Sequence, residues 1–234
     1  MSSQKGIDSK KNKFFEMLSN VLREQRVFEQ SVVILIGSLA RNIPTWRSDV
    51  DFLVITPISI KRPRVPVDVH LHLTTRMEFL KKLEEGNDFE VWALKYGRTY
   101  SDPSGWWKNL LQDREYTKWP DWRKKVKHAR KRLSIAATLL AEGDHAAAEE
   151  EYLMAAAHIA RALLFKACVF PLSRPEMPAQ LREINLTEDA QVLDKLISGT
   201  STLGELKELA ESVENRLEQM ERLSNYIENK ILAS

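Results

Sequence analysis

The sequence has a single cysteine and no long apolar run, and both absences narrow the class of protein. Cys168 is alone among 234 residues, which rules out an internal disulfide and is typical of proteins in a reducing cytosol. It falls in a helical pattern, where we expect a small buried apolar side chain. The longest apolar run, VVILI, is far shorter than the roughly 18 residues of a membrane span. We also find no internal repeat and no low-complexity segment.

The amino-terminal segment, MSSQKGIDSKKNKFFEM, also lacks the features of a targeting signal. It carries lysines but no apolar h-region and no small-residue cleavage site, so we expect no secretory signal and predict a cytoplasmic protein. With 43% hydrophobic and 29% charged residues, the chain is long enough for one large or two modest domains with real cores.

Charge is spread unevenly along the chain, although the net charge is only +2. Residues 1–132 hold 26 Lys/Arg against 16 Asp/Glu, whereas residues 133–234 hold 9 against 17. The basic half suits a polyanionic ligand such as a nucleoside triphosphate. The charge distribution alone does not distinguish that ligand from nucleic acid.

The first half of the chain has the pattern of a small α/β unit. Apolar periodicity predicts helices over 9–29 and 76–86 and strands over 32–36, 51–56 and 65–73. The last strand alternates, which places Val67, Val69, Leu71 and Leu73 on one face and Asp68, His70 and His72 on the other.

The second half reads as helical. Turn formers and tryptophans interrupt the pattern between residues 98 and 121, and PLSRPEMP (171–178) reads as a proline-rich connection. Helices are predicted over 122–142, about 144–169, 187–198 and 206–231. We therefore predict an α+β chain, in which a small mixed-sheet domain (1–118) is followed by an all-α antiparallel helical bundle (119–234).

Two aspartates on one apolar strand are the first candidate site. Strand residues two apart point to the same side, so Asp49 and Asp51 are expected to project together, about 7 Å apart. That separation lets two carboxylates bracket divalent ions roughly 4 Å apart. Asp68, on the polar side of the next strand, is expected to complete the cluster. Three carboxylates without a nearby cysteine favour Mg²⁺ or Mn²⁺ over zinc, so the sequence predicts these three residues as metal ligands.

A glycine-serine pair precedes these aspartates, at the end of the strand over 32–36. Gly37 lacks the Cβ that would keep a phosphate away from the backbone. The amides of the helical turn that follows, with the Ser38 hydroxyl, are expected to donate to phosphate oxygens. Arg41 and Arg47 are close enough in sequence to neutralise the same triphosphate. A phosphate cradle beside metal ligands is typical of phosphoryl and nucleotidyl transfer.

Other interpretations of the charged residues remain open. Asp49 and Asp51 could instead cap a turn or form a structural ion pair with Arg41 or Arg47. The run from Lys118 to Arg132 holds eight Lys/Arg against one acid, and fits a solvated helix face as well as a phosphate or RNA contact.

The histidines and tryptophans have ordinary structural explanations. His70 and His72 could resemble zinc ligands, but their alternation favours exposed polar positions on a strand. Four tryptophans could stack on a base, but large aromatics at a domain junction favour core packing: Trp106, Trp107, Trp119 and Trp122.

The motif residues resemble a known family. Gly37-Ser38, then Asp49-Val50-Asp51 and a later Asp68, look like the nucleotidyltransferase superfamily of DNA polymerase β. More narrowly, GSLARN and SDVDFLVI resemble the minimal nucleotidyltransferases related to the kanamycin nucleotidyltransferases. The resemblance covers about residues 30–118, including ALKYGRTYSD. Asn42 stands where these proteins usually have glycine, and asparagine tolerates the left-handed conformation.

The helical half resembles the HEPN-type or substrate-binding bundles that accompany minimal nucleotidyltransferases, through HIARALLFKACVFPLSRPEMPAQL. HEPN ribonucleases use an Arg-x(4–6)-His motif. The one candidate here, Arg123 to His128, lacks the usual polar residue after arginine, so we interpret the bundle as non-nucleolytic.

The resemblance implies a Mg²⁺- or Mn²⁺-dependent enzyme that transfers a nucleoside monophosphate from a triphosphate, ATP being expected, and releases pyrophosphate. The acceptor could be a small aminated molecule, a protein hydroxyl or an RNA end, and a homodimer is plausible. The alternative is a non-catalytic or toxin–antitoxin-type interaction protein that retains nucleotide binding.

Overall fold

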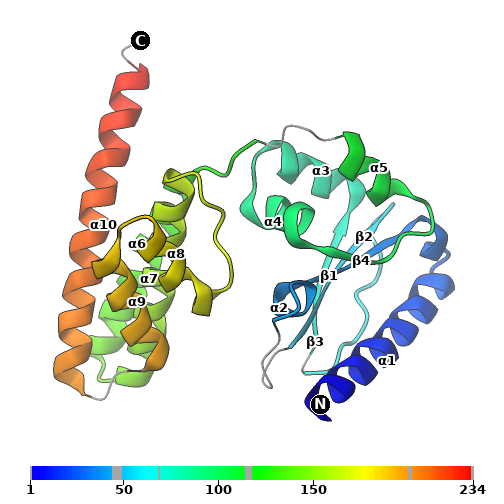
Figure 1. The fold of residues 1–234 in the computed structure, drawn as a ribbon, viewed down its shortest axis with the longest axis horizontal. Helices are drawn as coiled ribbons and strands as arrows, with labels where there is room; N and C mark the ends of the chain where they lie inside the picture. The colour runs from blue at the N-terminus through cyan, green and yellow to red at the C-terminus, as the bar shows by residue number, and fades with distance from the viewer. Residues whose placement is uncertain (1, 44–48, 68, 114–117, 200–201, 233–234) are drawn as a thin grey trace. The chain divides into compact units, whose positions relative to one another are not determined.

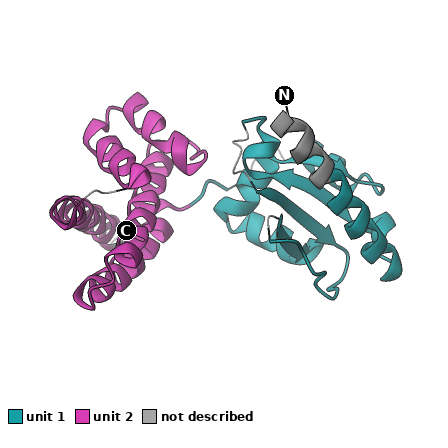
Figure 2. Ribbon diagram, turned by 90° about the horizontal axis from the view of Figure 1, so that it is seen from below, with its two compact units in different colours: residues 1–120 teal, residues 121–234 magenta. Residues whose placement is uncertain are grey.

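The computed structural model describes residues 2–43, 49–67, 69–113, 118–199 and 202–232. The chain divides into two compact units, Met1–Pro120 and Asp121–Ser234 (Figure 2). The first contains a small mixed sheet with helices, and the second contains helices and no strand among its described residues. The predicted α+β class is confirmed.

The first unit is built on a four-stranded sheet of order β3-β2-β1-β4. The strands are β1 (Val32–Ile36), β2 (Val50–Thr56), β3 (Val69–Thr75) and β4 (Arg98–Ser101). β1 pairs antiparallel with both β2 and β4, whereas β2 and β3 run parallel. Every residue of β1 is buried, as its run of β-branched and apolar residues predicts for a central strand.

Helices cover the two faces of this sheet. On one face α1 (Ser2–Glu24) packs Phe14, Leu18 and Leu22 against the apolar side chains of β1, β2 and β3 (Figure 1). On the other face lie α3 (Arg76–Glu84), α4 (Asp88–Tyr96) and α5 (Trp106–Asp113). Trp107 of α5 is 1% exposed and packs edge-on against Phe79 of α3. This tryptophan therefore belongs to the core, as its structural interpretation predicts.

The predicted strand over 65–73 is partly wrong. β3 begins at Val69, where its pairing with Val50 of β2 begins, and it extends to Thr75. Val67 is fully exposed and does not join the apolar face. Val69 N–H donates to the Pro66 carbonyl at 3.1 Å, a local turn contact just before the strand, and Pro66 itself has no N–H to donate to a strand ladder.

Several short elements were not predicted. α4, β4 and α5 all lie between residues 88 and 113; the sequence of α4 lacks a clear helical period, and turn formers and tryptophans interrupt the pattern after it. β4 has only four residues, RTYS, which carry no buried apolar alternation because the strand lies at the sheet edge. Local sequence therefore says little about it.

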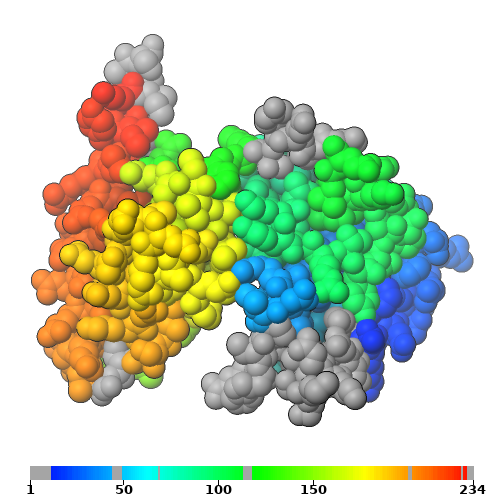
Figure 3. Space-filling view, viewed as in Figure 1, coloured from blue at the N-terminus to red at the C-terminus, as the bar shows by residue number. Residues whose placement is uncertain are grey.

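The second unit is a bundle of three long and two shorter helices. They are α6 (Trp122–Ala141), α7 (His145–Lys166), α8 (Met177–Glu183), α9 (Thr187–Ser198) and α10 (Leu203–Leu232). Asp121 and Asp144 cap α6 and α7, each accepting a hydrogen bond from a backbone N–H of the first turn. α8 was expected as a connection, but Pro178 sits in its first turn, where a missing N–H costs nothing. Figure 3 shows α9 (orange-yellow) beside α10 on one face of this unit.

The surroundings of Cys168 also differ from the prediction. α7 ends at Lys166, and Cys168 follows it with φ +59° and an exposed side chain. The helical pattern stops two residues before the cysteine, so its side chain does not enter the core.

None of the helices among the described residues combines the length and apolar content that a membrane crossing requires.

Candidate functional site

The candidate site begins where β1 ends beside the start of β2. The antiparallel register places Ile36 opposite Asp51, so Gly37 lies directly against that carboxylate. Gly37 has φ +71°, and a Cβ on it would lie 2.3 Å from Asp51 Oδ2. The structure thus explains why a glycine is needed at position 37 in a way that the sequence did not suggest. The missing side chain leaves room for the Asp51 carboxylate, whether or not a phosphate binds there.

The glycine-serine turn continues into α2 (Gly37–Ala40), a single helical turn. One turn has little macrodipole, so anion binding here would depend on local N–H groups and the half-buried Ser38. The Arg41 guanidinium lies over the Tyr96 ring, 5.7 Å from its centroid. Figure 3 shows α2 (light blue) bordering α4 (blue-green). Asn42 adopts the left-handed conformation with φ +57°, as its place in the motif predicts.

The two aspartates of the motif converge on one histidine. His70 Nδ1 lies 3.1 Å from Asp51 Oδ1, and His70 Nε2 lies 3.9 Å from Asp49 Oδ2. The side chain of Asp49 is 46% exposed and that of Asp51 only 25%. One imidazole therefore spans both carboxylates at the edge of the sheet.

The surroundings of Asp51 shift the pKa of its carboxyl group. Burial raises the pKa of Asp51, the hydrogen bond and charge of His70 and the charge of His72 oppose that rise, and Asp49 adds to it. Burial also lowers the pKa of His72, which lies beside Phe89 with ring centroids 4.7 Å apart. A buried carboxylate whose neutral form is favoured would gain from a nearby cation.

Asp49, Asp51 and His70 are oxygen and nitrogen donors suited to a divalent cation, but they do not complete a metal cluster. Within the described ranges, no group of three or more His, Cys, Asp or Glu side chains is arranged to hold a metal ion. A cation held by both carboxylates would compete with His70 for the same oxygens. The third predicted ligand, Asp68, lies outside the described residues, as does Arg47. The pair of aspartates fits Mg²⁺ or Mn²⁺ as two ligands of a larger set.

His70 is the site residue that sequence reasoning missed. Strand alternation put it on the polar face, and it is exposed there, but the alternation does not say which residue it faces. The parallel register pairs His70 with Asp51, and that register is a property of the assembled sheet. No spacing rule within the chain would have found it.

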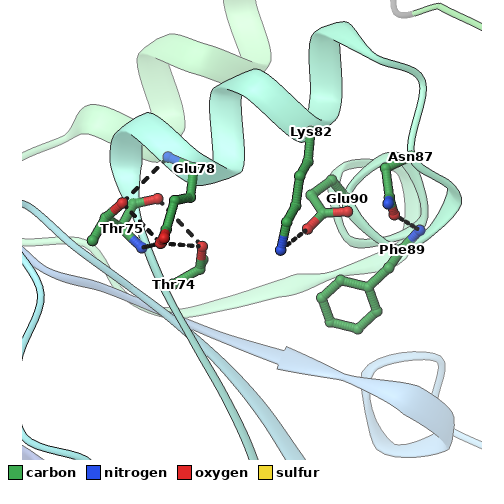
Figure 4. Close-up of polar contacts among 7 residues, drawn as sticks. All are labelled: Thr74, Thr75, Glu78, Lys82, Asn87, Phe89 and Glu90. Atoms are coloured by element: carbon green, nitrogen blue, oxygen red, sulfur yellow. Dashed lines mark hydrogen bonds and ion pairs between the residues drawn. The ribbon is translucent and has the colours of Figure 1, made fainter.

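A cavity of about 520 Å³ adjoins this histidine along β3. Its lining includes His70 and His72 of β3, Arg62 from the preceding loop, and Lys82 and Phe89 from the covering helices. Figure 4 shows the polar contacts at the starts of α3 and α4, the helices that supply Lys82 and Phe89. Thr75 and Glu78 form a reciprocal capping box at the start of α3, and the Asn87 side chain accepts from Phe89 N–H at the start of α4.

Glu90 lies in the wall of this cavity and is only 3% exposed. Its Oε1 lies 3.8 Å from Lys82 Nζ (Figure 4), and its buried Oε2 has no hydrogen-bond partner among the described residues. Burial raises the pKa of Glu90, against the influence of a backbone hydrogen bond and of Lys82. As the third residue of α4 it occupies a helix start, where a carboxylate is favoured.

Comparison with known proteins adds little to this geometry. No protein-family model matches the sequence, and no curated protein matches it. Among solved structures, the chain is similar to a nucleotidyltransferase-like protein from Exiguobacterium sibiricum 255-15, with a TM-score of 0.46 and 16% identity. The match covers 86% of this chain and 75% of the other. A likeness at this level decides neither activity nor site, and both rest on this chain's own residues.

Proposed function

We propose that the protein is a nucleotidyltransferase that moves a nucleoside monophosphate from a triphosphate, ATP being expected, to an acceptor, with release of pyrophosphate. One observation carries the proposal: Gly37 lies against Asp51 where β1 ends, Ser38 follows Gly37 in the chain, and Asp49 lies within reach of the histidine that contacts Asp51. A phosphate-binding turn next to paired carboxylates is the arrangement that nucleotidyl transfer needs.

The residues take distinct roles in this proposal. Asp49 and Asp51 would hold Mg²⁺ or Mn²⁺, which when bound supplies charge neutralisation for the triphosphate and for the leaving pyrophosphate. Ser38 would donate its hydroxyl to a phosphate oxygen, and Arg41 and Arg47 would offset the negative charge. Asp68 is assigned from sequence to the acceptor side, as a further ligand and as the base that accepts the acceptor's proton.

The acceptor class stays open among a small aminated molecule, a protein hydroxyl and an RNA end. A non-catalytic or toxin–antitoxin-type interaction protein that retains nucleotide binding is the alternative function. The partly buried position of Asp51, whose side chain is 25% exposed, supports an active site, because removing a carboxylate from water costs free energy. The likeness of the helical unit to HEPN-type bundles remains a prediction.

The direct test is transfer of label from α-³²P-ATP in the presence of Mg²⁺. The protein is incubated alone and with aminated small molecules, cell extract protein or RNA, and released pyrophosphate is measured in parallel. We expect a labelled product with the wild type and none with Asp51→Asn. Asp194→Asn, which removes an exposed carboxylate of α9, serves as the control and should transfer label normally. Nucleotide binding without any transfer would favour the interaction protein.

Calorimetry separates binding from chemistry. Ser38→Ala should weaken ATP binding by roughly 10- to 150-fold, because a hydrogen bond to a charged group contributes about 1.5–3 kcal/mol. Asp68→Asn should leave ATP affinity within several-fold while single-turnover transfer falls by roughly 10²- to 10⁴-fold, the usual contribution of a general base. Near wild-type turnover in Asp68→Asn would remove that residue from the mechanism.

A further inference from the structure

Helix α6 contains most of the basic run noted in the sequence, and its two sides differ in how charge is balanced. Successive residues turn by about 100°, so Arg123 and Arg130, seven apart, share one side. Arg123 Nε lies 2.8 Å from Asp121 Oδ1, and Arg130 Nε lies 2.8 Å from Glu221 Oε1 of α10. Both arginines on this side are therefore neutralised by carboxylates.

The adjoining side of α6 carries three lysines at positions i, i+3 and i+7, which places them in one stripe. Lys124, Lys127 and Lys131 are all exposed, and within the part of the chain that the structure describes none of them forms an ion pair. At 1.5 Å of rise per residue, the stripe is about 10 Å long. We refer to these three residues as the α6 lysine stripe.

Further positive charge flanks the stripe, in the seam between α6 and α7. Lys125 is only 9% exposed, and the rings of His128 and His158 meet edge-on with centroids 5.3 Å apart. Arg132, one turn along α6, is balanced by Glu151 at 2.9 Å. Arg161 adds a cation from α7.

The pKa of His158 reflects both burial and the charged side chains around it in this seam. Burial, followed by the positive charges of Arg161, Lys125, His128 and Arg132 in that order, lowers the pKa of His158 to about 3. The Nδ1 atom of His158 is buried without a hydrogen-bond partner among the described residues. The charged groups that act on His158 are therefore all cationic side chains or histidine.

We propose that the α6 lysine stripe, with the seam beside it, binds the phosphodiester backbone of a nucleic acid. The lysines are spaced about 4.5 and 6 Å apart along the helix axis, on the scale of the distance between successive phosphates of one strand. A single phosphate cannot contact cations spread over about 10 Å, so a polymer fits better than a free nucleotide. Lysine contacts to phosphate do not depend on base identity, so the binding is sequence-tolerant and sensitive to salt.

This inference is independent of the proposed nucleotidyl transfer. It uses residues of the second unit alone, and none of them belongs to the candidate site. Nucleic-acid binding without nucleotidyl transfer would leave the inference intact, and transfer without nucleic-acid binding would refute the inference but not the proposed function.

Fluorescence anisotropy with a fluorescein-labelled 20-nucleotide single strand of mixed sequence tests the inference. RNA and DNA versions are titrated at several KCl concentrations between 50 and 200 mM, without ATP. The test variant combines Lys124→Gln, Lys127→Gln and Lys131→Gln. The control combines Lys166→Gln, Lys195→Gln and Lys207→Gln, which removes the same charge from exposed positions on α7, α9 and α10.

We expect wild-type affinity to fall linearly with salt on logarithmic axes. Loss of three phosphate contacts should make that slope shallower by about 2, since each contact contributes about 0.7 for a single strand. Affinity at 50 mM KCl should fall at least tenfold in the test variant and stay within about twofold in the control. Equal binding of RNA and DNA would support backbone recognition, and a preference for RNA would support contacts to the 2′-hydroxyl as well.

Three outcomes would refute the inference. The first is no binding of either strand by the wild type at 50 mM KCl. The second is an equal loss in the two triple variants, which would indicate a general effect of net charge. The third is stripe-dependent binding to phosphatidylserine vesicles without binding to nucleic acid. Circular dichroism melts of both variants check that they fold alike, as substitutions of exposed lysines predict.

Discussion

Replacing Gly37 with alanine tests the idea that this glycine exists to accommodate a buried carboxylate. An alanine there would have to keep φ near +71°, a conformation that costs an L-residue about 1–2 kcal/mol. Its Cβ would also lie 2.3 Å from Asp51 Oδ2, well inside normal contact distance. Since overpacking typically costs about 1–3 kcal/mol, Gly37→Ala should destabilise the first unit by roughly 2–5 kcal/mol in total.

Two further variants separate backbone strain from the overlap. Gly105 has nearly the same φ, +68°, but a Cβ on it would meet nothing within 4 Å, so Gly105→Ala should cost only about 1–2 kcal/mol. In an Asp51→Ala background the nearest atom to the new methyl group at position 37 is a Cβ at 3.5 Å, an ordinary contact. There the cost of Gly37→Ala should fall to that of Gly105→Ala, which gives a coupling of about 1–3 kcal/mol.

Urea unfolding followed by tryptophan fluorescence measures these costs, because Trp122 is the only one of the six tryptophans outside residues 1–120. The reasoning would be refuted if Gly37→Ala and Gly105→Ala cost the same, or if the cost of Gly37→Ala were unchanged in the Asp51→Ala background. Either result would mean that the glycine serves backbone conformation alone.

Three other predictions follow from the ionised groups. Burial raises the pKa of Asp51, so the wild type loses stability as pH rises and this carboxyl group ionises. Without metal, Asp51→Asn should therefore have a higher melting temperature than the wild type at pH 7. An equal or lower melting temperature would contradict this. Burial also raises the pKa of Glu90, so the stability of Glu90→Gln relative to the wild type should increase as pH rises from 4 to 7. A difference in stability that stays constant with pH would show that ionising Glu90 costs no stability. Arg216 holds Asp189 through a two-pronged contact, so Arg216→Lys should destabilise the second unit by about 1–2 kcal/mol in urea, against less than about 0.5 for the exposed control Arg222→Lys.

Much of the first unit's framework could be predicted from sequence because its central strands are local signals. VVILI and DFLVIT are buried on both faces, and a run of apolar β-branched residues suffices to identify such strands. β4 gave no such signal, because an edge strand of four residues owes its existence to pairing with β1, whose partner residues lie 63 to 68 positions earlier. α4 was missed because its nine residues carry apolar side chains without a clear helical period.

The candidate site shows the same division between local and assembled features. The adjacency of Gly37 and Asp51 follows from two strands joined by a connection, which the spacing of the motif predicted in outline. The partnership of His70 with both aspartates depends on the register of β3 against β2, which no local pattern specifies. Arg47 and Asp68 remain predictions from sequence.

The pairing of β4 with β1 has a consequence for biosynthesis. Val33 pairs with Ser101, so the sheet cannot close until the ribosome has released a chain that extends past that residue. Until then the apolar strand Val32–Ile36 presents an open edge, the kind of surface that recruits other chains. By contrast, α6 and α7 are joined by a short turn and can pair as soon as both are made. The nascent first unit is thus the vulnerable part of this protein, and a chain that stops at residue 97 is expected to aggregate where one that stops at residue 120 folds.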